Sequence, residues 1–439
     1  MDRGCGLYLP ISELYNKYGY GCFSKEAYDF IDYISNLKVK YWQIEPLNLF
    51  EDIYYKKSTS SFAGNPLYID IEKYLTSEEI EFFKIDNSLS YEDYRLKKNE
   101  VLRYIFDKMY YSTNIDKFIE NNEYWIYDYA VFMALKDELN VDYIDFPEQY
   151  KNIDSGETIS FIKTHSEEII YYIFIQYLFF KQWKELKKYA SLRGIKIITT
   201  SDLLVSNDSS DLYANKRLFI INKNENNENN ISFNFNNIKN EIYKYFIDRY
   251  KFNSSLYDLI IINYNESIDD KDFDSLANEL LNNGVKNIIF DVNNYNIDGD
   301  GTKIINYSFK SKYLIKNTID GFLHNQKDNL PNNYSKKVIG YLGFKNYRSL
   351  SYYLDNEIFF KKIANYLNLD VSTDKSTIIK MAIENIIISN ADVCIIDIKD
   401  ILFNDTFVEN INFTNKLKKN YQEESLFLYL KELIKNKNR

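Results

Sequence analysis

Short apolar runs alternate with longer helical patterns along most of the chain. The runs are rich in β-branched residues and apolar on both faces, as expected of strands that surrounding helices bury. Eight such runs are Leu7–Ile11, Tyr41–Glu45, Ile195–Thr199, Asp258–Asn263, Asn287–Asp291, Lys303–Phe309, Lys337–Leu342 and Asp392–Asp397. Helical patterns, for example Lys25–Leu37 and Phe273–Asn283, lie between most of them. This alternation is typical of βα units, and the number of runs predicts an α/β fold of the (β/α)8 TIM-barrel type.

The stretch between the second and third runs is too long for a loop and carries helix patterns of its own. It includes "TSEEIEFFK", with a capping-box start at Thr76, followed by "YEDYRLKKNEVLRYIFDKMYY" and "YWIYDYAVFMALKDEL". The last residues, "EESLFLYLKELIKNKNR", form an amphipathic helix pattern. We therefore predict barrel strands 1 and 2 in residues 1–50, an inserted helical subdomain in residues 51–168, and the rest of the barrel with a C-terminal helix in residues 169–439.

Two polar segments are interpreted as loops. Residues 222–241, "NKNENNENNISFNFNNIKNE", are low in complexity and are predicted to form a solvated loop. The segment "NIDGDG", residues 296–301, is similar to the start of a calcium-binding loop. It has Asn296 where the first aspartate ligand should be and Tyr307 where the bidentate glutamate should be, so a tight polar turn is the better interpretation.

Charge and composition exclude several classes of protein. The net charge of -10 disfavours a nucleic-acid partner, which needs a basic face. The three cysteines have no metal-binding spacing, and the two histidines lie far apart in the sequence. We find no secretory signal pattern and no apolar run long enough to span a bilayer. We expect a reduced cytoplasmic location, no membrane partner, no metal and no cofactor.

Several blocks, in a fixed order, resemble one enzyme family. They are "GLYLPISELYNKYGYGCFSKEAYDFIDYISNLKVKYWQIEPL", "SSFAGNPLYID", "YWIYDYAVFMALK", "FIQYLFFKQWKELKKYASLRGIKII", "DSSDLYAN" and "ADVCIIDIKDIL". The ordered set is similar to the amylomaltases, the 4-α-glucanotransferases of glycoside hydrolase family 77, which disproportionate malto-oligosaccharides. The resemblance implies a (β/α)8 barrel with helical insertions and a site at the carboxyl ends of the strands, in agreement with the strand count.

The chemistry of such a family requires two carboxylates about 5–5.5 Å apart. One attacks the anomeric carbon, and the other donates a proton to the leaving oxygen and then activates the acceptor hydroxyl. The resemblance places Asn263 at the position of the nucleophile, Ile261 at that of an orienting arginine and Tyr264 at that of a sugar-binding histidine. A neutral amide cannot form the glycosyl ester. Asp291 stands at the acid/base position, where the family has the longer glutamate.

Further family positions are also changed. The resemblance places Asn346 at a transition-state-stabilising aspartate, Lys345 at a histidine beside it, and Lys56 at a substrate-contacting tyrosine. The family's Gly-Asp-Leu-Pro at the end of the third strand has become Thr199–Asp202. The loop that covers the acceptor side of the family's groove has no counterpart, and the Asn-rich segment stands in its place.

Several alternatives remain open at these positions. The run "YDLIII" fixes the alignment at Asn263, because a strand cannot slip by one residue without exposing its buried face, whereas Asn346 is anchored only by a Tyr-x-Gly pattern. A substitute nucleophile would have to be Asp258, about 17 Å away at the other end of the strand, or Glu266, which nothing positions. Asp291 fits a solvated strand end or a helix cap as well as a surviving acid.

The three tryptophans are candidates for sugar platforms. Trp42 and Trp183 lie in scaffold blocks and are predicted to be core residues, and Trp125 fits either role. Three functions follow. The favoured one is a catalytically inactive amylomaltase homologue that binds α-glucan or malto-oligosaccharide, or regulates a partner such as an active paralogue. The alternatives are an active 4-α-glucanotransferase with a rebuilt site and a scaffold protein without a sugar function.

Overall fold

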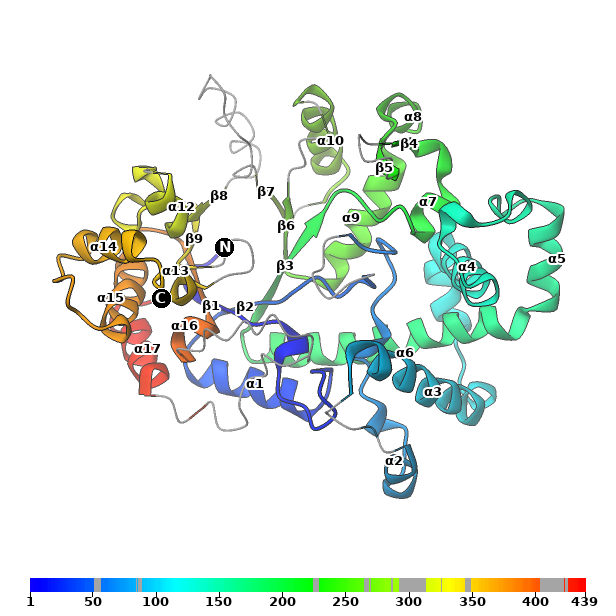
Figure 1. Ribbon diagram of the computed structural model, residues 1–439, viewed down its shortest axis with the longest axis horizontal. Helices are drawn as coiled ribbons and strands as arrows, with labels where there is room; N and C mark the ends of the chain where they lie inside the picture. The colour runs from blue at the N-terminus through cyan, green and yellow to red at the C-terminus, as the bar shows by residue number, and fades with distance from the viewer. Residues whose placement is uncertain are drawn as a thin grey trace.

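Eight parallel strands form the centre of the molecule. The computed structural model describes residues 1–50, 57–83, 85, 89–223, 229–263, 268, 270–285, 287–291, 313–324, 326–343, 349–402, 422 and 425–439. In these residues one sheet runs in the order β7-β6-β3-β2-β1-β10-β9-β8 and curves into a (β/α)8 barrel with helices outside it (Figure 1). The strands are β1 (Gly4–Tyr8), β2 (Tyr41–Gln43), β3 (Lys196–Asp202), β6 (Leu259–Asn263), β7 (Ile288–Asp291), β8 (Leu314–Asn317), β9 (Val338–Tyr341) and β10 (Val393–Asp397). The predicted fold class is confirmed.

Alternate residues of each strand belong to two different apolar cores. One core lies inside the barrel and includes Ile198 of β3, Ile261 of β6 and Ile289 of β7. The neighbouring residues Ile260 and Ile262 point outward and pack against the helices. Both faces of a strand are thus apolar, which explains why the sequence shows continuous apolar runs instead of alternation.

The helices around the barrel match the periodic segments of the sequence. The predicted helix at 25–37 is α1 (Lys25–Asn36), that at 273–283 is α10 (Asp270–Asn282), and the C-terminal helix is α17 (Ser425–Asn436). The other barrel helices are α6 (Ser166–Leu192), α7 (Ser210–Ala214), α9 (Lys244–Leu256), α12 (Thr318–Leu323), α13 (Leu350–Tyr353), α14 (Glu357–Tyr366), α15 (Lys375–Ile388) and α16 (Ile398–Leu402).

Four helices lie in the described chain between β2 and α6. They are α2 (Ser77–Phe83), α3 (Tyr91–Met109), α4 (Asp116–Leu139) and α5 (Gly156–Thr164), and Figure 1 shows them to one side of the barrel. The capping box predicted at the start of α2 is present: Thr76 N–H donates to Glu79 at 2.7 Å, and Glu79 N–H donates to the Thr76 hydroxyl at 3.3 Å. The division at residues 50 and 168 stays a prediction, and residue 168 falls in the first turn of α6.

Helix α6 holds the segment 64–70 through two glutamine side chains. Gln176 accepts from Gly64 N–H at 2.8 Å and donates to the Gly64 carbonyl at 2.9 Å. Gln182 does the same with Asp70, at 2.7 and 2.9 Å. Both glutamines are buried, so each satisfies two backbone groups that would otherwise lack partners.

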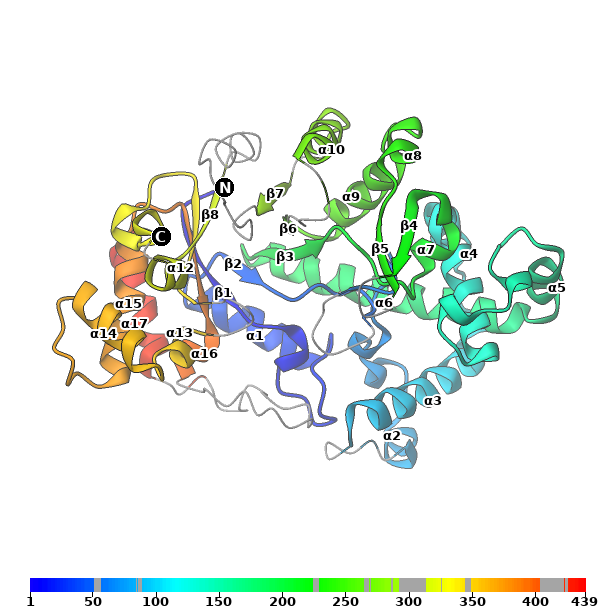
Figure 2. The ribbon, with the colours of Figure 1, turned by 45° about the horizontal axis from the view of Figure 1, so that its top comes forward.

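The interpretation of residues 222–241 as a solvated loop is wrong. The structure has an antiparallel hairpin there, β4 (Phe219–Lys223) and β5 (Asn229–Phe233), followed by α8 (Phe235–Asn240). Figure 2 shows the hairpin next to α7. Ile231, Phe233 and Ile238 are buried. These few apolar residues pack the segment against the rest of the protein. The many asparagines between them leave no apolar pattern that predicts strands or a helix.

The barrel contains one strand that the sequence did not predict. Strand β8 is only four residues long, "LIKN", and pairs with β9. A strand this short, with two polar residues, gives no apolar run. The predicted strand at 303–309 and the "NIDGDG" turn at 296–301 lie outside the described residues.

All three tryptophans belong to the core. Trp42 and Trp183 are fully buried, as predicted, and Trp125 is 4% exposed and stacks on Phe62 at a centroid distance of 5.8 Å. Trp125 therefore does not present a sugar platform. Cys5, Cys22 and Cys394 are free and buried. Within the described residues, every helix is too short or too polar to cross a membrane.

Candidate functional site

Three polar side chains at the carboxyl ends of β3, β6 and β7 form a row. Asp202 pairs in register with Asn263, and Asn263 pairs with Asp291. Each lies an even number of residues from an inward-facing isoleucine of its own strand, so all three belong to the inner face. The apolar barrel core thus ends in a polar layer, at the end of the barrel where side chains from different strands meet.

Asn263, the residue at the nucleophile position, is bonded to the first carboxylate of this row. Its amide nitrogen donates to Asp202 Oδ1 at 2.8 Å. Burial raises the pKa of Asp202, and the hydrogen bond from Asn263 and the charge of Arg249 oppose that rise. The Asn263 amide therefore stabilises a neighbouring carboxylate.

Arg249 of α9 fixes the end of β3 that carries Asp202. Its guanidinium donates to the Leu203 carbonyl at 2.6 Å and to the Asp202 carbonyl. It is 3% exposed, and the same group donates to the Ser201 hydroxyl at 3.4 Å. Arg249 thus holds backbone, in contrast to an arginine that would orient a nucleophile.

The backbone places Asn263 and Asp291 side by side on neighbouring strands. They are register partners on adjacent strands, which lie about 4.8 Å apart, and two carboxylates in a retaining site are about 5–5.5 Å apart. The charge of Asp291 adds to the effect of burial in raising the pKa of Tyr341, on β9. Asp291 therefore lies on the inner face of the barrel near Tyr341, and its role as an acid, a solvated strand end or a helix cap stays a prediction.

A hydrogen bond crosses the barrel beneath the row. Tyr341 donates its hydroxyl to Gln43 Oε1 of β2 at 2.6 Å. Both residues are buried, and Gln43 Nε2 is a buried donor without a partner in the described part of the chain. This hydrogen bond links β2 to β9 inside the barrel.

Two further buried carboxylates, Asp397 and Glu45, stand at or just beyond the ends of β10 and β2. Asp397 ends β10, beside Tyr8 of β1, and burial raises the pKa of its carboxyl to about 6 against the opposing charge of Lys399. Asp397 Oδ1 accepts from Lys399 N–H at 2.9 Å, and Oδ2 has no partner among the described residues. Glu45 has a raised pKa through burial, and it accepts from Ile11 N–H, Ser12 N–H and the Tyr68 hydroxyl, which indicates a structural role.

The structure tests only part of the predicted site. It brings Asn263 and Asp291 together and places Ile261 in the inner core, 2% exposed. The remaining predicted positions, Lys56, Tyr264, Lys345 and Asn346, lie outside the described residues, as does the alternative acid Glu266.

Sequence reasoning missed the parts of the polar layer that the family pattern does not mark. It identified Asp202 only as part of a lost motif, and it did not single out Gln43, Tyr341 or Asp397. The alternation of side chains between the two faces of a strand could have identified them. Each of these residues is the last inward-facing residue of its strand.

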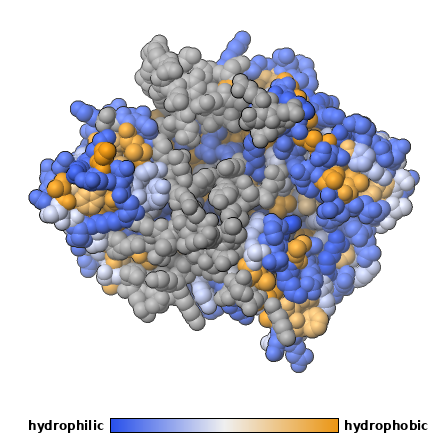
Figure 3. All heavy atoms as spheres, in the orientation of Figure 1, coloured by the Kyte–Doolittle hydropathy of each residue, from blue (hydrophilic) through white to orange (hydrophobic). Residues whose placement is uncertain are grey.

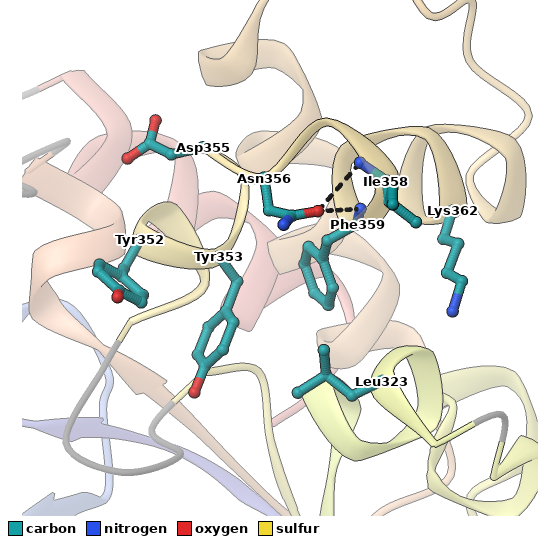
Figure 4. Close-up of a pocket in the computed structure, with 8 residues that line it drawn as sticks. All are labelled: Leu323, Tyr352, Tyr353, Asp355, Asn356, Ile358, Phe359 and Lys362. Carbon is teal, nitrogen blue, oxygen red and sulfur yellow. Dashed lines mark hydrogen bonds between the residues drawn. The ribbon is translucent and has the colours of Figure 1, made fainter.

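A separate cavity of about 630 Å³ lies away from the strand ends (Figure 4). Its walls come from α12, α13 and α14 and consist of Leu323, Tyr352, Tyr353, Asp355, Asn356, Ile358, Phe359 and Lys362. Its polar groups already serve the fold: Asn356 caps α14, Lys362 donates to the Phe322 carbonyl at 2.9 Å, and Asp355 pairs with Lys375 at 3.0 Å. We assign no chemistry to it.

In the described residues, neither the outer surface nor the arrangement of possible metal ligands indicates a second site. Figure 3 shows apolar side chains gathered over α14 and over the end of α2, where Ile358 and Phe82 are 70% and 76% exposed. Within the described residues, no three His, Cys, Asp or Glu side chains are grouped closely enough to hold a metal ion.

A parallel eight-stranded barrel with polar groups at its strand ends is the architecture of the (β/α)8-barrel enzymes. Comparison with known proteins narrows this class. The family model described as 4-alpha-glucanotransferase matches residues 9–263. The chain belongs to the 4-alpha-glucanotransferase family.

Similar proteins agree with this assignment. A 4-alpha-glucanotransferase of Clostridium butyricum is 35% identical over 229 residues, 49% of this chain and 47% of that protein. The corresponding protein of Aquifex aeolicus is 31% identical over 225 residues, 49% of this chain and 46% of its own length. The matched stretch therefore spans about half the length of each of these relatives.

The fold is similar over a longer stretch than the sequence. An amylomaltase from Streptococcus agalactiae, solved in complex with acarbose, has a TM-score of 0.86 at 20% identity and covers 100% of this chain and 99% of its own. An amylomaltase from Corynebacterium glutamicum has a TM-score of 0.72 at 12% identity, covering 98% of this chain and 73% of its own. These likenesses establish the fold, and the activity has to be argued from the site.

Proposed function

We propose that this chain is an amylomaltase-like protein that has lost retaining glucosyl transfer. The observation that supports the proposal is the hydrogen bond from the Asn263 amide to Asp202. A nucleophile must offer an unprotonated, negatively charged oxygen to the anomeric carbon. At this position the side chain is neutral, and its nitrogen is committed to a neighbouring carboxylate.

The acid/base position alone cannot sustain the reaction. Asp291 could donate a proton to a leaving oxygen, but without a nucleophile on the adjacent strand no covalent intermediate forms. Asp202 does not replace that nucleophile, because its backbone lies on the far side of Asn263 from Asp291, two strands away. Its carboxylate is also already engaged by the amide.

We further propose that the barrel mouth binds α-glucan without cleaving it. The polar layer offers carboxylate and amide oxygens, which can accept hydrogen bonds from sugar hydroxyl groups. The ligand class follows from family membership, since the curated relatives are 4-alpha-glucanotransferases. Such a protein could act as a glucan-binding or regulatory partner of an active paralogue, whereas a scaffold protein would not bind the sugar.

Binding is tested by calorimetric titration with maltoheptaose and, separately, acarbose. We expect saturable heat and a rise in melting temperature that follows ligand concentration, because a ligand that binds only the folded state stabilises it. Cellopentaose, a β-linked glucan, is the control and should give neither signal. Absence of saturation with both α-linked ligands would favour the scaffold function.

An active enzyme with a rebuilt site is the alternative function. Membership of a family of transferases is the observation that favours it. It predicts that maltotriose is converted to glucose and longer oligosaccharides. The binding titration does not detect this conversion, whereas analysis of the products by chromatography does.

A further inference from the structure

The contact between Asp202 and Asn263 limits which side chains position 263 can carry. The amide nitrogen and the carboxylate oxygen are 2.8 Å apart, and the two residues are register partners on adjacent strands, so the backbone fixes their spacing. An aspartate at position 263 is nearly the same size as asparagine. It would place a second carboxylate against that of Asp202 at hydrogen-bonding distance.

We propose that Asp202 and Asn263 are a coupled pair, in which Asp202 holds the Asn263 amide in place and excludes an ionised carboxylate from position 263. This proposal rests on the proposed function and extends it from one lost catalytic group to two interacting residues. On this proposal, the nucleophile position carries an amide, and the neighbouring Asp202 prevents a single substitution from restoring an ionised carboxylate there. Asp202 acts here as a positioning residue, because it acts through Asn263.

The positive charge of Arg249, on α9, already stabilises the carboxylate of Asp202, so a second carboxylate would have to share it. The hydrogen bonds of Arg249 go to the backbone carbonyls of residues 202 and 203 and to the Ser201 hydroxyl. Tyr250, on the same helix, is buried and its hydroxyl lies 3.5 Å from the Ser201 hydroxyl. On the other side of position 263 stands Asp291, a further carboxylate. Two carboxylates at this distance share one proton, as in other close carboxylate pairs.

The proposal predicts the pH dependence of stability of Asn263→Asp. A shared proton raises the pKa of the pair in the folded state above its unfolded value. Stability from such a pair is complete below the unfolded pKa and is lost as the pH rises through the folded pKa. The melting temperature of N263D should therefore fall further and further below that of the wild-type protein from pH 5 to pH 8, reaching a deficit of several degrees.

The exchanged pair, which combines Asp202→Asn with Asn263→Asp, is the decisive second variant. In it the amide introduced at position 202 can donate to the carboxylate introduced at position 263, so one charge and one hydrogen bond are kept. Its melting temperature should return toward that of the wild-type protein, and its pH profile should run parallel to it. If N263D does not fold at neutral pH, the exchanged pair must still fold.

Asn317→Asp is the matched control, because Asn317 also ends a barrel strand but its amide donates to the Gly343 carbonyl at 3.1 Å. It should show a smaller change with pH than N263D. The proposal is overturned if N263D runs parallel to the wild-type protein from pH 5 to pH 8, or if the exchanged pair is no more stable than N263D. These melting profiles do not depend on glucan binding or turnover.

Discussion

At the scale of single residues, the candidate site is a row of a carboxylate, an amide and a carboxylate at three adjacent strand ends. Asn263 and Asp291 occupy adjacent strand ends, where a retaining pair would stand, yet only one of them is a carboxylate. The strand register brings these two positions together. The effect of each substitution is therefore electrostatic, and changes of pH should report it.

Asp397 gives a prediction that is independent of Asn263. Burial raises the pKa of its carboxyl to about 6, with the charges of Lys399 and Glu13 nearby, whereas the unfolded value is about 3.9. Its contribution to stability is therefore present below about pH 4 and is lost as the pH rises through about 6. Asp397→Asn should gain stability relative to the wild-type protein between pH 4 and pH 7, by up to about 3 kcal/mol.

Thermal unfolding scans across this range measure the effect. Asp145→Asn, at an exposed aspartate, controls for the general loss of a negative charge. A constant difference between D397N and the wild-type protein at every pH would show that Asp397 does not titrate as a buried group.

The sequence predicted Asn263 correctly as a strand-end residue but could not predict its partner. The run "LIII" before Asn263 sets which residues face inward. The partner depends on the register between β3 and β6, which are separated in the chain by the hairpin, three α-helices and one 3-10 helix of the described residues. No local pattern determines that register, so the sequence marks Asp202 only as part of a changed motif.

At the scale of elements, buried side chains on α6 position the segment that precedes the inserted helices. Gln176 and Gln182 each bind both backbone groups of one residue, Gly64 or Asp70. Each glutamine therefore satisfies both backbone groups of a residue that lies outside the eight strands of the barrel sheet. Replacing either by an apolar residue of similar size leaves two backbone groups without partners.

Gln182→Leu should lower the free energy of unfolding by about 2–6 kcal/mol, because it leaves two buried backbone groups unsatisfied and each costs about 1–3 kcal/mol. Gln149→Leu, at an exposed position, is the control and should have little effect. Denaturant unfolding measures both. Equal stability of Q182L and the wild-type protein would mean that the Asp70 backbone finds other partners, such as water.

The elements that sequence analysis missed share a physical cause. The β4–β5 hairpin and α8 are held by a few buried apolar residues among many asparagines, and β8 has only four residues. In both, tertiary packing decides the structure. Long periodic helices such as α3 and α4 were predicted from the sequence because their pattern repeats over several turns.

At the scale of the whole molecule, the likeness to known relatives extends further along the chain in fold than in sequence. The family match ends at residue 263, whereas the fold of an amylomaltase is matched along the whole chain. A barrel can keep its fold on apolar pattern alone, while its strand ends need particular side chains. The proposed loss of transfer activity, with the fold kept, would follow if only strand ends had changed.

The most direct measurement is the incubation of the 439-residue protein with maltotriose, with analysis of the products by chromatography. The 4-alpha-glucanotransferase of Clostridium butyricum is the positive control, and heat-denatured protein is the blank. We predict that neither glucose nor maltotetraose accumulates above the blank with the wild-type protein or with N263D. Appearance of both products with the wild-type protein would contradict the loss of retaining transfer.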